Sequence, residues 1–151
     1  MVKSGDMVIG QYTSKVADNG RTALPKKFRE ELGVKFVITQ GYEGSLLIVP
    51  VENWEQMVKE TTDKPFLMGQ ARDVTRFLLG GATYIDLDEQ GRFIIPSYLR
   101  TYGQVGTEII FLGLGKYIEV WDMKKWQDYH KGLSGNIENI AQKLANFKNG
   151  E

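Results

Sequence analysis

The sequence predicts an α+β protein made of two pseudo-symmetric halves, and three observations lead to this prediction. A Gly-Arg, Pro, Arg skeleton occurs twice at a constant spacing of 71 residues, at Gly20, Arg21, Pro25 and Arg29 and again at Gly91, Arg92, Pro96 and Arg100. Each copy is followed by two short runs of β-branched and apolar residues around a glycine-containing link, which is typical of a β-hairpin. The segments between and after the copies carry apolar residues at helical spacing.

The overall composition fits one compact domain or two small, interlocked halves. The chain has 151 residues, and its 19 basic and 19 acidic side chains cancel. A net charge of zero does not decide whether the protein binds nucleic acid, because a local basic patch is sufficient. The absence of cysteine excludes disulfides and thiolate-bound metals. No apolar run reaches the length of a signal peptide or the ~20 residues of a membrane helix, so we expect a cytoplasmic protein with no membrane partner.

Each copy is expected to begin with a strand, a turn and a second strand. The segments "QYTSKVADNGRTAL" and "ATYIDLDEQGRFII" turn at Gly20 and Gly91, because glycine best tolerates positive φ. Pro25 and Pro96 then fix φ where a short helix begins. The hairpins follow, with the links "GYEGS" after residues 36–40 and "GLGK" after residues 108–112.

Helices are expected in the remaining segments. "VENWEQMVKETT" follows the first hairpin and "MKKWQDYHKGL" the second. A linking helix has its apolar stripe at Leu67, Ala71, Val74 and Leu78, and a separate C-terminal amphipathic helix has one at Ile137, Ile140, Ala141, Leu144 and Phe147. Such stripes favour packing in the core or between subunits. The predicted segments are a first half (10–56), a helical link (57–81), a second half (82–127) and a C-terminal helix (128–151).

The motif search predicts no enzyme, no metal site and no cofactor. His130 is the only histidine, so no Ser/His/Asp arrangement exists without it. "DLDEQG" resembles the start of a calcium loop, but Ser97 stands where the bidentate acid is needed. "GLGK" lacks both the earlier glycine and the following Ser or Thr of a phosphate loop.

The charge around the two skeletons differs. Residues 15–29 have a net charge of +4, from Lys15, Arg21, Lys26, Lys27 and Arg29 against Asp18, whereas residues 86–100 have −1. A basic window on a turn in a neutral protein predicts phosphate contacts, with arginine able to bind a guanine edge through two hydrogen bonds. For Arg29 and Arg100, on the short helices, an ion pair within the protein's own fold is an equal alternative.

A family resemblance extends these inferences. "VADNGRTALPKKFREELGV" resembles the SpoVT–AbrB type of DNA-binding module, and two such modules in one chain resemble the MraZ family of transcriptional regulators. The resemblance covers nearly the whole chain, through "LLIVPVENWEQ", "RFLLGGATYIDLDEQGRFIIPSYLR" and "FLGLGKYIEVWD". It implies a swapped-hairpin β-barrel formed by both halves, a homo-oligomeric ring and a nucleoid location. It further implies repression of the division and cell-wall gene cluster, including the protein's own promoter, by binding tandem short repeats in double-stranded DNA.

The family motif, Asp-x-x-x-Arg, is complete only in the second half, at Asp88 and Arg92. In the first half Arg21 is present, but Ala17 stands where the acid is expected, so Arg21 is either freer or supported by Asp18. The candidate DNA-binding residues are Lys15, Asn19, Arg21, Lys26, Lys27, Arg29, Asp88, Arg92 and Arg100. The alternatives are an AbrB-type antitoxin, a ring-forming interaction module without a DNA role, in which Trp54 and Trp126 only pack, and a barrel enzyme or ligand binder.

Overall fold

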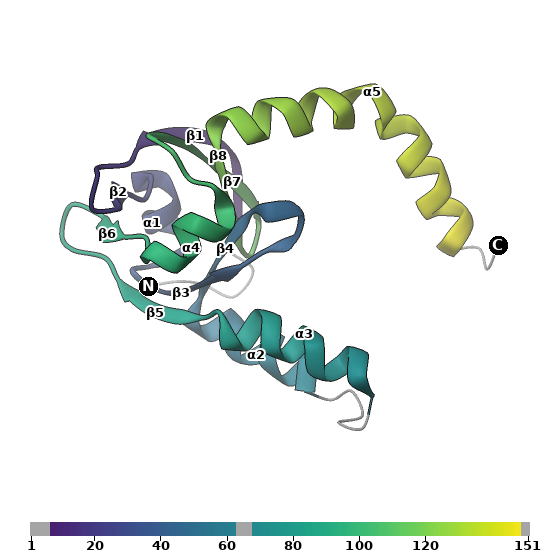
Figure 1. Cartoon of the computed structure of the whole chain (residues 1–151), viewed down its shortest axis with the longest axis horizontal. Coiled ribbons are helices and arrows are strands. Elements are labelled where there is room, and N and C mark those ends of the chain that lie inside the picture. Colours follow the sequence, from purple (N-terminus) through teal and green to yellow (C-terminus); the bar gives the residue numbers. More distant parts are fainter. Residues whose placement is uncertain (1–6, 63–67, 149–151) are drawn as a thin grey trace.

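The fold is α+β, as predicted, and a computed structural model describes residues 7–62 and 68–148 (Figure 1). The first half contains β1 (Val8–Lys15), β2 (Arg21–Ala23), α1 (Lys26–Leu32), β3 (Lys35–Gln40), β4 (Leu46–Pro50) and α2 (Val51–Thr62). After α3 (Gly69–Gly80), the second half contains β5 (Thr83–Asp86), β6 (Arg92–Ile94), α4 (Ser97–Gly103), β7 (Glu108–Gly115), β8 (Ile118–Asp122) and α5 (Met123–Lys148). The element order is therefore repeated, as the two skeletons predict.

Strand pairing interlocks the two halves. The larger sheet has the order β1-β7-β8-β4-β3-β5, and β2 and β6 form a separate two-stranded sheet. The predicted hairpins β3–β4 and β7–β8 are confirmed. By contrast, the strands on either side of each glycine turn pair with the other half, since β1 pairs with β7, β5 with β3, and β2 with β6. Neither half completes its sheets alone.

The core is built from equivalent positions of the two halves. Phe28 on α1 and Leu99 on α4 are 71 residues apart, and both are fully buried in one cluster that also contains Leu24 and Ile95. Each such side chain stabilises the fold by about 1.5–3 kcal/mol through burial. Pro25 and Pro96 stand directly before the two short helices, with φ of −53° and −54°, as predicted from the fixed proline φ.

The second hairpin has a shorter link than the sequence suggested. Strand β7 continues through Gly115, so "GLGK" is mostly strand and only residues 116–117 lie between β7 and β8. The reason is the pairing of Gly113 with β1, where a Cβ atom would lie 2.8 Å from the backbone nitrogen of Ile9. Gly113 therefore permits close approach of two strands rather than marking a turn, and it is Gly115, with φ of 87°, that ends β7 at the link.

The expected pair of C-terminal helices is a single helix. Helix α5 runs from Met123 through Lys148 without interruption, although Figure 1 shows it bent part-way along. Gly132 and Gly135 do not end it, because an internal glycine costs a helix only about 1 kcal/mol and no proline follows. The prediction of two helices was wrong for this reason.

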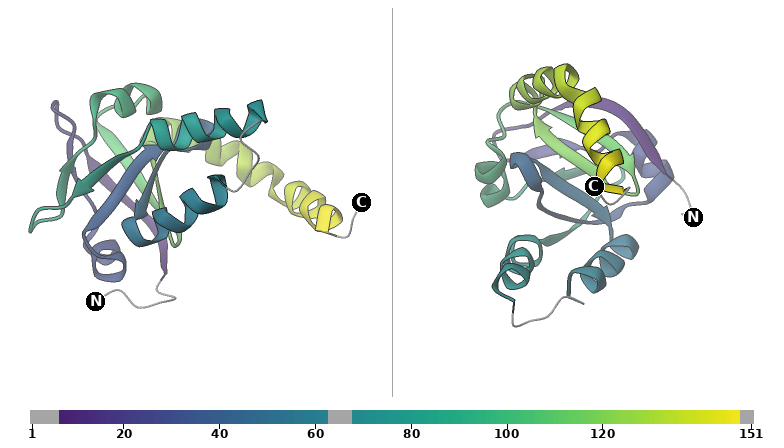
Figure 2. Two further views of the ribbon diagram at one scale, coloured as in Figure 1. Left: turned by 90° about the horizontal axis from the view of Figure 1, so that it is seen from below. Right: turned by 90° about the vertical axis from the view of Figure 1, so that its right-hand side faces the viewer.

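Helices α2 and α3 project from the sheet together, and the two-stranded β2–β6 sheet lies at the opposite end of the molecule (Figures 1 and 2). Helix α3 ends at Gly80 with Gly81 as its C-terminal cap, as predicted, while Leu67 of its proposed stripe lies outside the described residues. Buried Thr39 donates a hydrogen bond of 2.6 Å to the Leu78 carbonyl, and Tyr98 donates one of 2.9 Å to the Gly81 carbonyl. These bonds fix the end of α3 against β3 and α4.

Candidate nucleic-acid interface

Two turns of the same shape carry the repeated Gly-Arg pairs. Gly20 and Gly91 have φ of 91° and 77°, which explains the glycine at both positions. The Gly20 amide donates to the Ala17 carbonyl (2.8 Å), and the Gly91 amide donates to the Asp88 carbonyl (2.9 Å). Strand β2 begins directly after the first turn and β6 directly after the second, so each arginine is the first residue of its strand.

Pairing of β2 with β6 brings Arg21 and Arg92 together. Arg21 lies opposite Ile94 and Ala23 lies opposite Arg92, so the two arginines are diagonal neighbours, about 7–8 Å apart in such a ladder. Residues opposite one another, and residues two apart, share a face of the sheet. Thr22 and Phe93 are buried on the inner face, whereas both arginines are exposed. We call the outer face, made of Arg21, Ala23, Arg92 and Ile94, the arginine face.

The second turn contains its own acid. Asp88 Oδ1 accepts hydrogen bonds from the backbone amides of Arg92 (2.8 Å) and Gln90 (2.9 Å), and its Oδ2 accepts one from Arg92 Nε (2.8 Å). These bonds, led by the one from the Arg92 amide, hold the pKa of Asp88 below its ordinary value against an opposing effect of desolvation. The Arg92 guanidinium is thereby held in an ion pair at the edge of the arginine face.

The first turn has no acid on its arginine. Asn19 Oδ1 accepts a 3.0 Å hydrogen bond from the Arg21 backbone amide, which replaces one of the bonds made by Asp88. Within residues 7–62 and 68–148, the Arg21 guanidinium forms no ion pair, with Asp18 or with any other acid. Of the two possibilities left open for Arg21, the structure therefore supports the freer side chain.

The predicted lysines precede and follow the first turn in the sequence, and two of them pair with acids. Lys15 ends β1, and its carbonyl accepts a hydrogen bond of 2.9 Å from Thr22 on β2. Lys26 and Lys27 on α1 form exposed pairs with Glu30 (4.0 Å) and Glu31 (3.5 Å). These acids lie just beyond the window that gave +4, and they offset part of its charge. Exposed pairs of this kind are weak, so both lysines can exchange their partner for a phosphate.

Arg29 and Arg100 are directed inward. Arg29 Nε donates to the Leu24 carbonyl (3.2 Å), and Arg100 Nε donates to the Ile95 carbonyl (2.9 Å). Both side chains are half-buried. Neither forms the ion pair that was the alternative to DNA contact, within the described part of the chain, because backbone carbonyls serve as their acceptors instead. They lie under the turns rather than on the arginine face.

Sequence reasoning missed Ile94, which is opposite Arg21 and 47% exposed. An exposed isoleucine between two arginines offers apolar contact, for example to a thymine methyl group. The signal was present in the sequence, since the alternation of "RFI" puts Arg92 and Ile94 on one face. It had no meaning, however, until the pairing of β6 with β2 was known.

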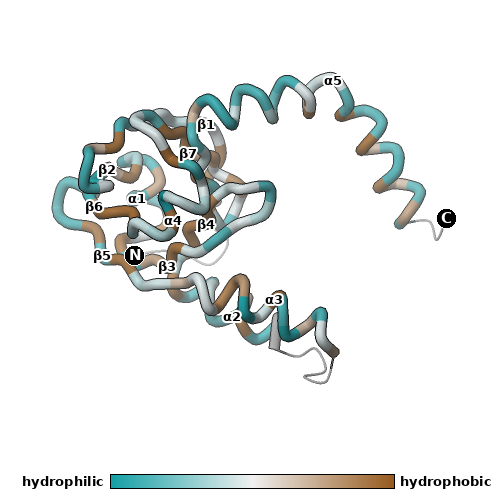
Figure 3. The backbone as a smooth tube through the Cα atoms, in the orientation of Figure 1, coloured by the Kyte–Doolittle hydropathy of each residue, from teal (hydrophilic) through white to brown (hydrophobic). Residues whose placement is uncertain are grey.

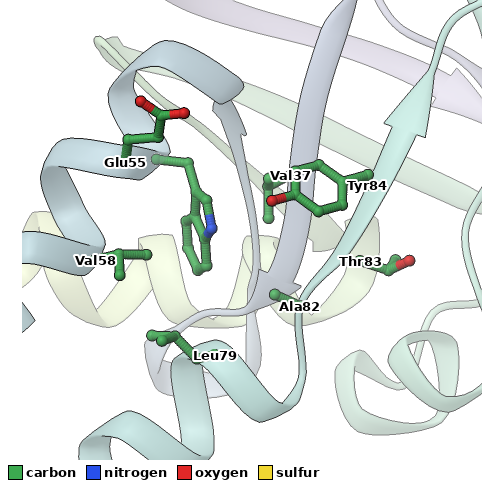
Figure 4. Close-up of a pocket in the computed structure, with 8 residues that line it drawn as sticks. Val37, Glu55, Val58, Leu79, Ala82, Thr83 and Tyr84 are labelled. Atoms are coloured by element: carbon green, nitrogen blue, oxygen red, sulfur yellow. The ribbon is translucent and has the colours of Figure 1, made fainter. Parts of the chain in front are cut away.

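An apolar pocket of about 430 Å³ lies far from the arginine face. Its lining comes from β3, α2, α3 and β5 and includes Trp54, Val58, Leu79 and Tyr84, with Glu55 at the rim (Figure 4). Among the described residues, no three His, Cys, Asp or Glu side chains gather where they would hold a metal ion. In the same ranges, no helix combines the length and the apolarity needed to cross a membrane.

Comparison with known proteins identifies the family. A family profile described as "MraZ protein, putative antitoxin-like" matches residues 7–77 and again residues 78–148. The chain belongs to the MraZ family. Three relatives named Transcriptional regulator MraZ, from Moorella thermoacetica, Caldanaerobacter subterraneus and Syntrophomonas wolfei, are 38%, 38% and 36% identical over 141 residues. Those residues are 93% of this chain and 99% of each relative. The family match thus repeats with the same two halves that share the arginine face.

Proposed function

We propose that this chain is a sequence-specific DNA-binding transcriptional regulator that binds DNA through its arginine face. The observation that carries the proposal is that Arg21 and Arg92, from different halves, stand on one exposed face of a two-stranded sheet. The major groove of B-DNA accepts a two-stranded β-ribbon, and arginine is the side chain that most often reads guanine there. The name shared by the relatives supports a role in transcription. The function is binding, and no catalytic step is assigned.

The other candidate residues have distinct roles in this proposal. Lys15, Lys26 and Lys27 bind phosphates beside the groove and set the register of the protein on the duplex. Ile94 contacts the base next to the one read by Arg21. Asn19 and Asp88 hold the two turns, so they act on DNA through the arginines that they orient.

The scaffold is the swapped-hairpin barrel implied by the resemblance. The pairing of β1 with β7 and of β5 with β3 supports it, because both strands cross between halves. One chain then supplies both halves of the unit that presents the arginine face, which accounts for the repeated skeleton.

We further propose that the protein assembles into a ring through its projecting helices. The outer part of α5 has no partner among the described residues, and its apolar residues are exposed, with Ile137 at 48% and Phe147 at 76%. Figure 3 shows hydrophobic positions recurring along this part of the helix. An apolar stripe in this position requires a partner surface. Heterologous contacts of this kind close into rings when the rotation permits.

The resemblance also supplies the proposed target, which is the promoter of the division and cell-wall gene cluster, including the protein's own promoter. In this proposal the protein is cytoplasmic and associates with the nucleoid. It represses the promoter when the arginine faces of several protomers bind tandem repeats together. Joint engagement of several sites raises affinity by roughly 10²–10⁴-fold over one site. Repeats spaced by about one helical turn, near 10 bp, present the same groove face to neighbouring protomers.

A second candidate is a ring-forming interaction module without a DNA role. The exposed stripe on α5 and the Trp54 pocket favour it, because both are apolar surfaces remote from the arginine face. This candidate predicts oligomers with no affinity for the promoter.

Both candidates are tested by binding to promoter DNA with one repeat, several repeats in phase, and several repeats offset by half a turn. We expect tight binding only to the in-phase array. The Arg21→Ala/Arg92→Ala double variant should lose that binding and keep its oligomeric state in sedimentation. The proposal is contradicted if the wild-type protein does not bind promoter DNA, or if it binds all three DNAs with equal affinity.

A further inference from the structure

Each half supports the turn of the other half with an arginine. Arg100, on α4 of the second half, donates from Nε to the Ile95 carbonyl and from Nη1 to the Asp18 carbonyl in the first turn, at 2.9 and 3.3 Å. It also packs beneath Gly20, where a Cβ atom would lie 2.7 Å from Arg100 Nε. The turn that presents Arg21 therefore rests on a side chain 79 to 82 positions away in the sequence.

The reverse contact uses Arg29. Its Nε donates to the Leu24 carbonyl, and its guanidinium packs beneath Gly91, where an added Cβ atom would collide with it. The backbone repeats this exchange, since the Leu24 amide donates to the Gly91 carbonyl and the Ile95 amide donates to the Gly20 carbonyl, each at 2.9 Å. In both directions, the residue that bonds the opposite turn through its amide also bonds the arginine through its carbonyl.

We infer that Arg100 and Arg29 are positioning residues that act across the halves. Arg100 fixes the turn that presents Arg21 to DNA, and Arg29 fixes the turn that presents Arg92. The inference rests on the proposed function for the DNA contacts themselves. It reassigns both arginines from DNA contact to support of the turns. It also explains why the skeleton repeats Gly-Arg together with the later arginine, because the last arginine of one copy occupies the space beside the glycine of the other.

The contacts differ in strength between the two directions. Arg100 reaches a carbonyl inside the first turn, and charge-assisted bonds of this type are roughly twice as strong as neutral ones. Arg29 has only packing against the second turn, which already contains Asp88 as an internal support. Loss of Arg100 should therefore weaken DNA binding more than loss of Arg29.

A direct phosphate contact predicts a different dependence on salt. Each phosphate that a protein neutralises adds about 0.9 to the slope of log affinity against log salt. Removal of a positioning residue lowers the affinity and leaves this slope unchanged. Removal of a contacting residue lowers both.

The experiment is a pair of double-variant cycles on the promoter array, with full salt titrations. Arg100→Ala should weaken binding by roughly tenfold or more with an unchanged slope. In the Arg21→Ala background, Arg100→Ala should cause little further loss of affinity. In the Arg92→Ala background, it should cause its full loss. Arg29→Ala should show the reverse pattern with a smaller effect. Arg76→Ala, on exposed α3, is the matched control and should do nothing.

One further variant and one measurement without DNA make the test more specific. Arg100→Lys keeps the charge but not the planar fork, so it should fail to restore binding. Hydrogen exchange of the free protein should accelerate at the Gly20 amide in Arg100→Ala and at the Gly91 amide in Arg29→Ala. Equal acceleration at both turns, additivity of Arg100→Ala with Arg21→Ala, or a reduced salt slope overturns the inference. If Arg21→Ala and Arg92→Ala do not affect binding, the proposed function fails. The exchange data still show whether Arg100 and Arg29 stabilise the turns of the opposite halves.

Discussion

The first and second turns have the same backbone and are held by different side chains. In the second, Asp88 accepts three hydrogen bonds, including one from the guanidinium that the turn presents. In the first, Ala17 occupies the equivalent position, Asn19 replaces one bond, and Arg100 supports the turn from the other half. The same turn backbone can thus be stabilised by a side chain of the turn itself or by a side chain of the other half.

The difference has a consequence for binding. Arg92 must leave or share Asp88 when it approaches a base or phosphate, whereas Arg21 has no ion pair to break among the described residues. The acids at 30 and 31 reduce the local excess of positive charge near Arg21, but they pair with the lysines and not with the arginine. Arg21 is therefore the readier of the two contacts.

The largest expected effect is a difference in stability between alanine variants of the two turn glycines, Gly20 and Gly91. In Gly20→Ala, the new Cβ would meet the backbone carbonyl of Ile95 at 2.7 Å as well as Arg100, and a carbonyl in the core cannot move aside. Backbone strain at φ of 91° and overpacking together should lower the free energy of unfolding by about 2–5 kcal/mol.

Gly91→Ala should cost less, about 1–3 kcal/mol, because the nearest atoms are those of the flexible Arg29 side chain. Urea unfolding of both variants measures the difference, and Gly132→Ala, in an open part of α5, is the control. Equal losses at the two glycines would show that the turns are supported alike.

The next effect ranks the two arginines. Arg21→Ala should weaken binding to the in-phase promoter array by about 1–3 kcal/mol, the usual value of a base-reading arginine. Arg92→Ala should cost less, because wild-type Arg92 gives up its Asp88 bonds to bind. Fluorescence anisotropy with labelled DNA provides both values. A larger loss at Arg92 would reverse the ranking.

The sequence was sufficient for the features that depend on local backbone geometry. Gly20 and Gly91, the two prolines and the β3–β4 hairpin follow from preferences of single residues, and all are as predicted. It was insufficient where close approach of remote segments determines the structure. Gly113 and Gly115 resemble a link until their pairing with β1 is known.

The same limit applied to the site. A +4 window identified Arg21 and the lysines, but a charge count cannot distinguish an arginine on the surface from one beneath a turn. The roles of Arg29 and Arg100 depend on contacts made across 62 to 82 positions, and the role of Ile94 depends on the β2–β6 register. These are properties of the fold and not of any window.

A smaller effect concerns the phosphate contacts of the first half. The positions equivalent to Lys26 and Lys27 are Ser97 and Tyr98, so only the first half carries lysines on its short helix. Lys26→Gln/Lys27→Gln should reduce the salt slope by about 0.9 for each lysine that contacts a phosphate. Lys131→Gln on exposed α5 should not change the slope. Glu30→Gln/Glu31→Gln should raise affinity modestly by releasing the lysines, and an unchanged slope in the lysine variant would remove α1 from the interface.

The smallest effect is a difference in pH response between the turns. The pKa of Asp88 is lowered from 3.8, chiefly by the hydrogen bond from the Arg92 amide. Its stabilisation of the second turn is therefore fully present above that ordinary value and is lost as the pH falls through the lowered one. The acceptor of the Arg21 amide is the neutral side-chain oxygen of Asn19, which does not titrate.

An NMR titration from pH 6 to pH 2 should therefore move the Arg92 amide resonance with a midpoint below 3.8, and the Arg21 amide should move less. Asp88→Asn should abolish the transition at Arg92. Ala17→Asp should create one at Arg21, because it restores the acid at the equivalent place in the first turn. If the Arg21 amide resonance moves with pH in the wild-type protein as far as the Arg92 amide resonance does, the first turn has an acidic support that is absent from the described residues. In that case the two turns would be held alike, and the greater availability of Arg21 would lose its physical basis.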